Sequence, residues 1–348
     1  MTINSPMYAG FAHQRYDVAS LPFMPFSDTG GEALSDTGAV VGGILNSDGS
    51  VSLAQWFKGS LTDLGAPPGL PSRDFNRPRV FGVNGSGTIV GTVHTPAGDL
   101  PSRPFLYDRG RFTVLPLVDP TDLGGAAIGV NSRGQVVGYD HTSSNRMTAW
   151  LWSNDGYCSL PVSGTHVVAF GINSGGTIIG NRTFGLIRRL LTGRFHCTGQ
   201  RGYVLSQGTV RHLNGFVHAI NDLGEAAGGS AAGGKPLATV FRNGIATIIL
   251  NLPSAAVGIN SVADVVGFYQ PDGSRLRRLF IWNANSGVFD LTPDGYRSAQ
   301  AAAINDHGQV LGFGETVGGE RPYFLLTPAP NGVLTPKALT TARPAGAR

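Results

Sequence analysis

Few charges, few cysteines and no long apolar run occur in this chain, and each shortage excludes a class of protein. Charged residues make up 14% of the 348 residues, against about a quarter in typical soluble domains. The only cysteines, Cys158 and Cys197, are too few for a disulfide framework. No stretch of about 18 apolar residues occurs, which excludes a membrane-spanning helix.

Two further patterns are missing. No long window has apolar residues at helical spacing. Residues 1–26 contain no basic segment followed by an apolar one, so we expect no signal peptide and a cytoplasmic location.

The basic character of the chain comes mainly from its C-terminal end. Of the net charge of +4, Lys337, Arg343 and Arg348 supply three, and residues 329–348 contain no acid. The rest of the chain is left near +1, too little for a nucleic-acid-binding surface. We expect residues 329–348 to be a disordered basic tail.

Glycine is abundant, with 51 residues, and it marks a repeat. Each copy contains a small residue, an aliphatic, Asn, a short variable stretch, Gly, further aliphatics and a closing Gly. The copies are centred on Asn84, Asn131, Asn173, Asn221, Asn260 and Asn305, with a divergent first copy at Ser35. Successive Asn residues are 39–48 positions apart, a period typical of propellers and other repeat architectures.

One repeat predicts four short antiparallel strands. In the third copy we expect strands at 126–130, 135–139, 148–152 and 157–160, with tight turns between the first two and the last two. The third strands carry aromatic residues, namely Trp56, Phe105, Trp150, Tyr203, Phe241, Phe280 and Phe324. Four strands in a meander form one propeller blade.

The two ends of the repeat region complete each other. The seventh copy lacks a clear outer strand, and residues 16–21 resemble the missing one. We therefore predict an all-β fold, a seven-bladed β-propeller in residues 1–328 whose ring is closed by the N-terminal strand. We expect it to be a monomer.

The repeat also resembles a known family. The unit Gly-Ile-Asn-x-x-Gly-x-Val-Val-Gly, followed by a strand of the Phe-Leu-Trp type, is similar to that of the HAF-repeat proteins, bacterial proteins described as extracellular repeats. The resemblance covers about residues 30–327 and implies a propeller-like fold. It implies no general activity and no catalytic residues, and the extracellular description conflicts with residues 1–26.

The two faces of such a propeller differ in what they can do. The Asn turns join the first and second strands on one face, and their uniformity indicates a structural role, with Asn bonding its local backbone. We call this the Asn face. The opposite, variable face carries the loops between second and third strands, where the copies differ. Three residues after each closing Gly come Leu45, His94, His141, Thr183, Ala231, Gln270 and Glu315.

These positions supply the candidate site. Histidine titrates near neutrality, so a histidine pair can perform acid/base chemistry. We assign acid/base roles to His94, His141, Tyr139 and Glu315. We assign ligand binding to His166, Arg182, His218, Tyr269 and Gln270, with Asp140 and Glu32 beside them. Solvated loop histidines without a function remain the alternative.

A small molecule in the central funnel of the variable face is the function we expect, either simply bound or converted by elimination, isomerisation or cyclisation. We expect no cofactor. A zinc site at His94, His141 and Glu315 is disfavoured because their blades are not all neighbours.

Blade four suggests a different function. Its insert, residues 181–202, contains five arginines and no acid, mixed with apolar residues. Insertions on one face of a repeat array often mark its binding face. The alternative is therefore a protein- or glycan-interaction platform that uses this insert, and neither alternative involves nucleic acid or a membrane.

Overall fold

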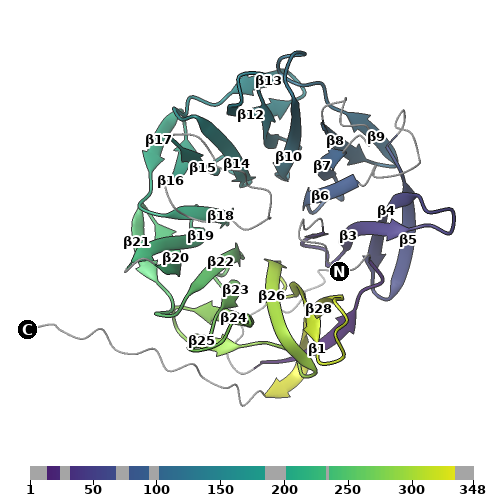
Figure 1. Cartoon of the computed structure of the whole chain (residues 1–348), viewed down its shortest axis with the longest axis vertical. Coiled ribbons are helices and arrows are strands. Elements are labelled where there is room, and N and C mark those ends of the chain that lie inside the picture. Colours follow the sequence, from purple (N-terminus) through teal and green to yellow (C-terminus); the bar gives the residue numbers. More distant parts are fainter. Residues whose placement is uncertain are drawn as a thin grey trace, which may run out of the picture.

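The computed structural model describes residues 14–23, 32–67, 78–93, 102–184, 201–232 and 235–333. Their strands form seven four-stranded antiparallel units arranged in a ring (Figure 1), which we number blades one to seven. This confirms the predicted seven-bladed, all-β propeller. None of the described residues forms a helix long and apolar enough to cross a membrane.

The first four blades follow the chain from the inner to the outer strand. Blade one consists of β2 (Ala33–Leu34), β3 (Val40–Leu45), β4 (Val51–Phe57) and β5 (Ser60–Gly65). Blade two consists of β6 (Pro78–Val83), β7 (Ile89–Val93), β8 (Arg103–Asp108) and β9 (Arg111–Val114). Blade three consists of β10 (Gly124–Val130), β11 (Val136–His141), β12 (Met147–Ser153) and β13 (Gly156–Ser159). Blade four consists of β14 (His166–Ile172), β15 (Ile178–Thr183), β16 (Arg201–Ser206) and β17 (Thr209–His212).

The remaining blades complete the ring. Blade five consists of β18 (Phe216–Ile220), β19 (Ala226–Ala232), β20 (Lys235–Arg242) and β21 (Ile245–Ile248). Blade six consists of β22 (Ser254–Ile259), β23 (Val265–Tyr269), β24 (Arg278–Asn283) and β25 (Gly287–Asp290). Blade seven consists of β26 (Tyr296–Ile304), β27 (Val310–Thr316), β28 (Tyr323–Val333) and β1 (Gln14–Ser20).

The N-terminal strand closes the ring as predicted. β1 pairs antiparallel with β28, so that Asp17 lies opposite Thr327 and Ser20 opposite Phe324. β28 extends to Val333, and residues 334–348 of the expected tail lie outside the described residues. Since β1 comes from the start of the chain and β28 from its end, their pairing joins the first blade to the last without leaving an open edge.

The repeated Asn residues form a belt of hydrogen bonds around the ring. Each Oδ1 accepts the backbone N–H four residues later, as Asn173 does from Thr177 at 2.9 Å, so the predicted local role is confirmed. Each Nδ2 also donates to a carbonyl of the next blade, over distances of 2.9–3.3 Å. The donors and acceptors are Asn84 to Asn131, Asn131 to Asn173, Asn173 to Asn221, Asn221 to Asn260, Asn260 to Asn305, and Asn305 to Ser35.

In blades two, three, four, six and seven the closing Gly of the repeat makes room for an aromatic ring, whereas in blade five Thr239 lies opposite Gly228. A Cβ added at Gly138 would lie 2.0 Å from the Ala126 carbonyl oxygen and 2.7 Å from the Trp150 ring. Phe105, Tyr203, Phe280 and Phe324 take the same place opposite Gly91, Gly180, Gly267 and Gly312. In blade one, Ala54 lies opposite Gly42, and Phe23 supplies the ring instead.

The first small residue of the repeat lies where the inner strands approach each other. A Cβ at Gly82 would come within 2.8 Å of the Ile128 carbonyl oxygen in the next blade. In blades two to seven the pairing of the inner strand with the second strand shifts register at the residue just before this position. The pairing therefore bypasses this residue. These bypassed residues are Phe81, Ile128, Phe170, His218, Val257 and Ala302, so they occupy equivalent positions around the axis.

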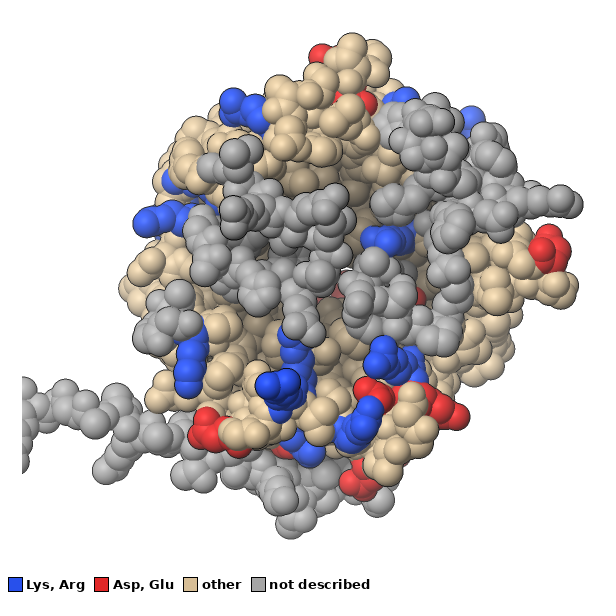
Figure 2. Space-filling model, viewed as in Figure 1, with Lys and Arg blue, Asp and Glu red and all other residues tan. Residues whose placement is uncertain are grey.

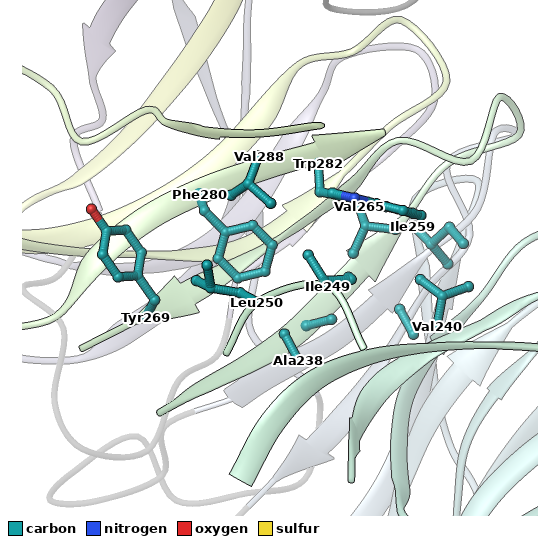
Figure 3. Packing of buried hydrophobic residues seen from close by; sticks show 12 residues of the cluster. Ala238, Val240, Ile249, Leu250, Ile259, Val265, Tyr269, Phe280, Trp282 and Val288 are labelled. Atoms are coloured by element: carbon teal, nitrogen blue, oxygen red, sulfur yellow. The ribbon is translucent and has the colours of Figure 1, made fainter. Parts of the chain in front are cut away.

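Apolar side chains fill the space between neighbouring blades. Figure 3 shows one such cluster, in which Ala238 and Val240 of blade five face Phe280 and Val288 of blade six. Because every blade packs on its two neighbours in this way, the core is a ring of contacts around the axis. The strands that carry the candidate site residues are therefore held firmly on both sides.

Candidate functional site

The variable face is only partly described. His94 lies outside the described residues, as do residues 185–200 of the Arg-rich insert. On the face drawn in Figure 2, Lys and Arg side chains gather over the blades at the bottom of the view, with Asp and Glu side chains among them. The site below is built from the described residues alone.

A row of side chains crosses the junction of blades three and four. His141 pairs with Met147 between β11 and β12. Met147 pairs with His166 across a parallel bridge that joins the two blades into one eight-stranded sheet. His166 pairs in turn with Thr183 of β15. The junction therefore brings together two histidines of the predicted site.

His166 is held from two sides. It is only 5% exposed, and its Nδ1 lies 3.4 Å from the Thr183 hydroxyl. Burial lowers its pKa, the charges of His141 and Arg146 act in the same direction, and a hydrogen bond to the Asn145 backbone opposes them. The ring is therefore neutral near pH 7, and a neutral imidazole can accept a proton.

His141 stands at the open side of this row. Its Nε2 lies 2.9 Å from Oδ1 of Asn145, in the loop between β11 and β12. The buried carboxyl of Asp122 is close enough for the two charges to interact. Burial raises the pKa of Asp122, Asp119 adds to this, and His141 opposes it.

Arg182, next to Thr183 in β15, is the most buried basic residue of the site. It is 8% exposed, and its Nη1 donates to the Ser163 carbonyl at 2.9 Å and to the Ser163 hydroxyl at 3.2 Å. The ring of Phe184 lies 4.7 Å from the guanidinium carbon. Its Nε is buried and has no hydrogen-bond partner.

Tyr139 and Asp140 have environments that point to different roles. Burial raises the pKa of Tyr139, against the influence of the positive charge of Arg79. Asp140 accepts hydrogen bonds from the Val118 backbone N–H at 2.6 Å and from Trp150 Nε1 at 2.9 Å. Asp140 thus joins the link between blades two and three to Trp150 of blade three, which is a structural role.

His218 occupies one of the bypassed positions near the axis. Its ring packs edge-on against Phe170 and Phe216, with centroid distances of 6.1 and 5.2 Å. Burial lowers the pKa of His218 to about 4. It is therefore a neutral, aromatic-flanked group that lies on blade five, in the blade next to the row.

The other predicted residues lie on blades six and seven and have partners there. Tyr269 donates to Asp290 at 3.0 Å, and Gln270 donates to the Ser274 carbonyl. Glu315 forms ion pairs with Arg297 and, at 3.7 Å, with Arg321. Since these blades do not border blade three, the structure does not bring these residues into the row.

Three residues that interact with this site were not predicted from the sequence. Asp122, Asn145 and Ser163 lie in the links and loops of the variable face, and none belongs to the repeated unit. The only one of the three with a sequence signal is Asn145, before Arg146, because Asn favours tight turns. Asn145 does adopt a positive φ of 58°. Nothing in the sequence marks Asp122 or Ser163.

The described residues contain no group of three or more His, Cys, Asp or Glu side chains placed to hold a metal ion. The described cysteine, Cys158, is exposed and unpaired. The chemistry available at the row is thus that of imidazole, hydroxyl, carboxyl and guanidinium groups.

Comparisons with known proteins agree on the fold and go no further. No protein-family model matches the chain, and no curated protein matches it. A chain of a crystallised mitotic checkpoint complex aligns with a TM-score of 0.54 and 11% identity over 94% of this chain and 96% of its own length. These values show a shared β-propeller fold alone.

Two peptidase structures give the same result. A puromycin-hydrolyzing peptidase of Mycobacterium tuberculosis aligns with a TM-score of 0.58 and 13% identity over 95% of this chain and 55% of its own. An acylaminoacyl peptidase of Pyrococcus horikoshii aligns with a TM-score of 0.52 and 12% identity, over 84% of this chain and 50% of its own. This chain spans about half the length of each peptidase.

Proposed function

We propose that this propeller binds a small molecule on its variable face, at the junction of blades three and four. The observation that carries the proposal is the row of His141, His166 and Thr183, which lie on paired strands of the two blades, with the Thr183 hydroxyl 3.4 Å from His166 Nδ1. The neighbouring blades pack on both sides of the row. Such packing keeps polar groups in fixed positions, as ligand binding requires.

His166 is the residue that we propose as proton acceptor. Burial keeps the ring neutral, the Asn145 backbone orients it, and the Thr183 hydroxyl lies beside its Nδ1. A base that is oriented by a third group and placed beside a hydroxyl is the usual arrangement for acid/base chemistry. The reaction class that we propose is elimination, isomerisation or cyclisation, none of which needs a cofactor.

A thermal-shift screen of small metabolites, followed by calorimetric titration of each compound that stabilises the protein, tests this proposal. Thr183→Val keeps the shape of the side chain and removes the hydroxyl, and His166→Asn removes the base. Both substitutions should weaken binding about tenfold, the value of one lost hydrogen bond in a buried site.

The control is His307→Asn, because His307 is exposed on the Asn face. This variant should bind each compound with the same affinity as the unmodified protein. The proposal is wrong if no compound binds, or if Thr183→Val and His166→Asn both bind every compound as tightly as the control does.

A second function has one observation in its favour. The Arg-rich insert has five arginines and no acid between residues 181 and 202, a composition suited to an acidic protein or glycan surface. Replacing residues 185–200 with a Gly-Ser linker should abolish capture of such a partner and leave the melting temperature nearly unchanged. Capture that survives the replacement contradicts this alternative.

The repeat is also our reason for proposing that the chain is a HAF-repeat protein. The motif that carries the resemblance contains the Asn, whose amide joins the blades, and the closing Gly, which receives the aromatic ring. The same two roles should recur in other proteins with this motif. A structure of one such protein without the belt would argue against a common family.

A further inference from the structure

Arg182 lacks the partner that comparable arginines of this protein have. Arg242, Arg278 and Arg297 each form an ion pair with a carboxylate on blade five, six or seven. The side chains of Arg242, Arg278 and Arg297 are 38–51% exposed, whereas Arg182 is 8% exposed. No carboxylate among the described residues pairs with Arg182, so the most deeply buried of the four charges is the uncompensated one.

The hydrogen bonds of Arg182 leave one edge of its guanidinium unused. Nη1 donates to Ser163, and the Phe184 ring lies against the guanidinium group. Nε is buried without a partner. Nε and Nη2 point the same way in a planar guanidinium and together form the edge that binds a carboxylate or phosphate with two parallel hydrogen bonds.

The surroundings of Arg182 add positive charge. Arg201 lies directly opposite it in the pairing of β15 with β16, and like charges in facing positions destabilise a sheet. Burial lowers the pKa of His212 in the next strand, and the charges of Arg182 and Arg201 add to this effect.

From these contacts we infer that Arg182 binds an oxyanion of the ligand, a carboxylate or a phosphate, through its Nε and Nη2. The inference rests on the proposed function and specifies its ligand as an anion. Thr183 follows Arg182 in β15 and presents its hydroxyl to His166. Since successive residues of a strand point to opposite faces of the sheet, Arg182 would hold the anionic group across β15 from the Thr183 hydroxyl.

The inference is tested with simple anions, so it does not depend on knowing the ligand. Inorganic phosphate and acetate are titrated separately into the purified protein, with chloride at equal ionic strength as the reference, and binding is followed by calorimetry and melting temperature. We expect one of the two anions to bind with a dissociation constant on the order of 1 mM or tighter. Phosphate binding alone indicates a phosphorylated ligand, and acetate binding alone indicates a carboxylic acid.

Two substitutions of Arg182 assign the binding to this residue. Arg182→Gln should weaken the anion about tenfold or more, and Arg182→Lys, which keeps the charge and loses the fork, should also weaken it. Arg211→Gln, at an exposed position of β17, is the matched control and should bind as the unmodified protein does. If Arg182→Gln does not fold, Arg182→Lys decides the question.

The inference fails if neither anion binds, or if the Arg182 variants bind it as tightly as Arg211→Gln. The same titration on Thr183→Val separates this result from the proposed function. If the anion requires Arg182 for binding, and no compound requires Thr183 or His166, the anion site is supported and the proposed function is contradicted. If a compound requires Thr183 but binds Arg182→Gln as tightly as the unmodified protein, the proposed function is supported and the anion site is contradicted.

Discussion

Replacing Asn173 with alanine tests the belt of hydrogen bonds that joins the blades. Asn173 is buried. Its Nδ2 donates to the Asn221 carbonyl of blade five at 3.1 Å, and its Oδ1 accepts from the Thr177 N–H at 2.9 Å. Alanine removes both bonds and leaves the Thr177 N–H without a partner, whereas the Asn221 carbonyl keeps the Gly224 N–H as a donor.

The expected cost follows from these two bonds. A net hydrogen bond contributes about 1 kcal/mol, and a buried group left unpaired costs about 1–3 kcal/mol. Asn173→Ala should therefore lower the free energy of unfolding by about 2–4 kcal/mol. In a domain of this size this corresponds to a fall of about 3–6 °C in melting temperature.

Blade one provides a natural comparison. There Ser35 stands in place of Asn, and its hydroxyl still accepts the backbone N–H of Ala39 at 3.0 Å. Asn173→Ser should likewise keep the local bond, lose only the link between blades, and cost about half as much as Asn173→Ala. Differential scanning calorimetry of both variants, with the exposed Asn285→Ala as control, measures the difference.

A serine variant as unstable as the alanine variant would show that the local bond contributes nothing. An alanine variant within about 0.5 kcal/mol of the control, the usual range for a surface substitution, would refute the belt as a stabilising feature.

Three further predictions concern the repeat and the axis. Ser35→Asn should supply the missing donor towards Asn84 and raise stability by about 1 kcal/mol; a lower melting temperature would contradict a continuous belt. Gly138→Ala should cost about 3 kcal/mol or more, because its Cβ would overlap the Ala126 carbonyl. A Cβ at Gly85 meets no atom within 4 Å, so Gly85→Ala should be tolerated. Equal urea midpoints for Gly138→Ala and Gly85→Ala would disprove the argument that the closing Gly makes room for its neighbours. For His218, whose pKa falls from 6.5 to about 4 in the folded protein, the unfolded chain takes up the proton first as the pH falls. Its stabilising contribution should therefore be complete above about pH 6.5 and disappear towards pH 4. His218→Leu should flatten the dependence of melting temperature on pH over this window, and an unchanged dependence would exclude the role of this ring.

Much of the fold could be predicted because the relevant interactions are local. The Asn turn, its Gly and the alternation of the strands all lie within one repeat, and seven repeats together specify seven blades. Even the closing strand was predictable, since residues 16–21 resemble an outer strand. The aromatic ring that lies over a closing Gly was harder to predict, because Phe23 fills that place in blade one from outside the repeat.

The candidate site was predicted residue by residue but not as an arrangement. His141, His166 and Arg182 could be chosen because they break the uniformity of the repeat. Their neighbours Asp122 and Ser163 carry no such signal, since they lie in links whose course depends on how the blades pack. His94 lies outside the described residues and stays a prediction.

The sequence by itself determined the blade, the number of blades and the difference between the two faces, because these depend on the spacing of Gly, Asn and apolar residues along the chain. Only the tertiary structure decided that each Asn amide reaches the next blade and that Met147, the partner of His141, joins His166 across a parallel bridge. It also decided that Arg182 is buried and pairs with no carboxylate of the described residues. The physical reason is that hydrogen bonds and charges act between atoms a few ångströms apart, and these atoms belong to strands that only the closed ring brings together.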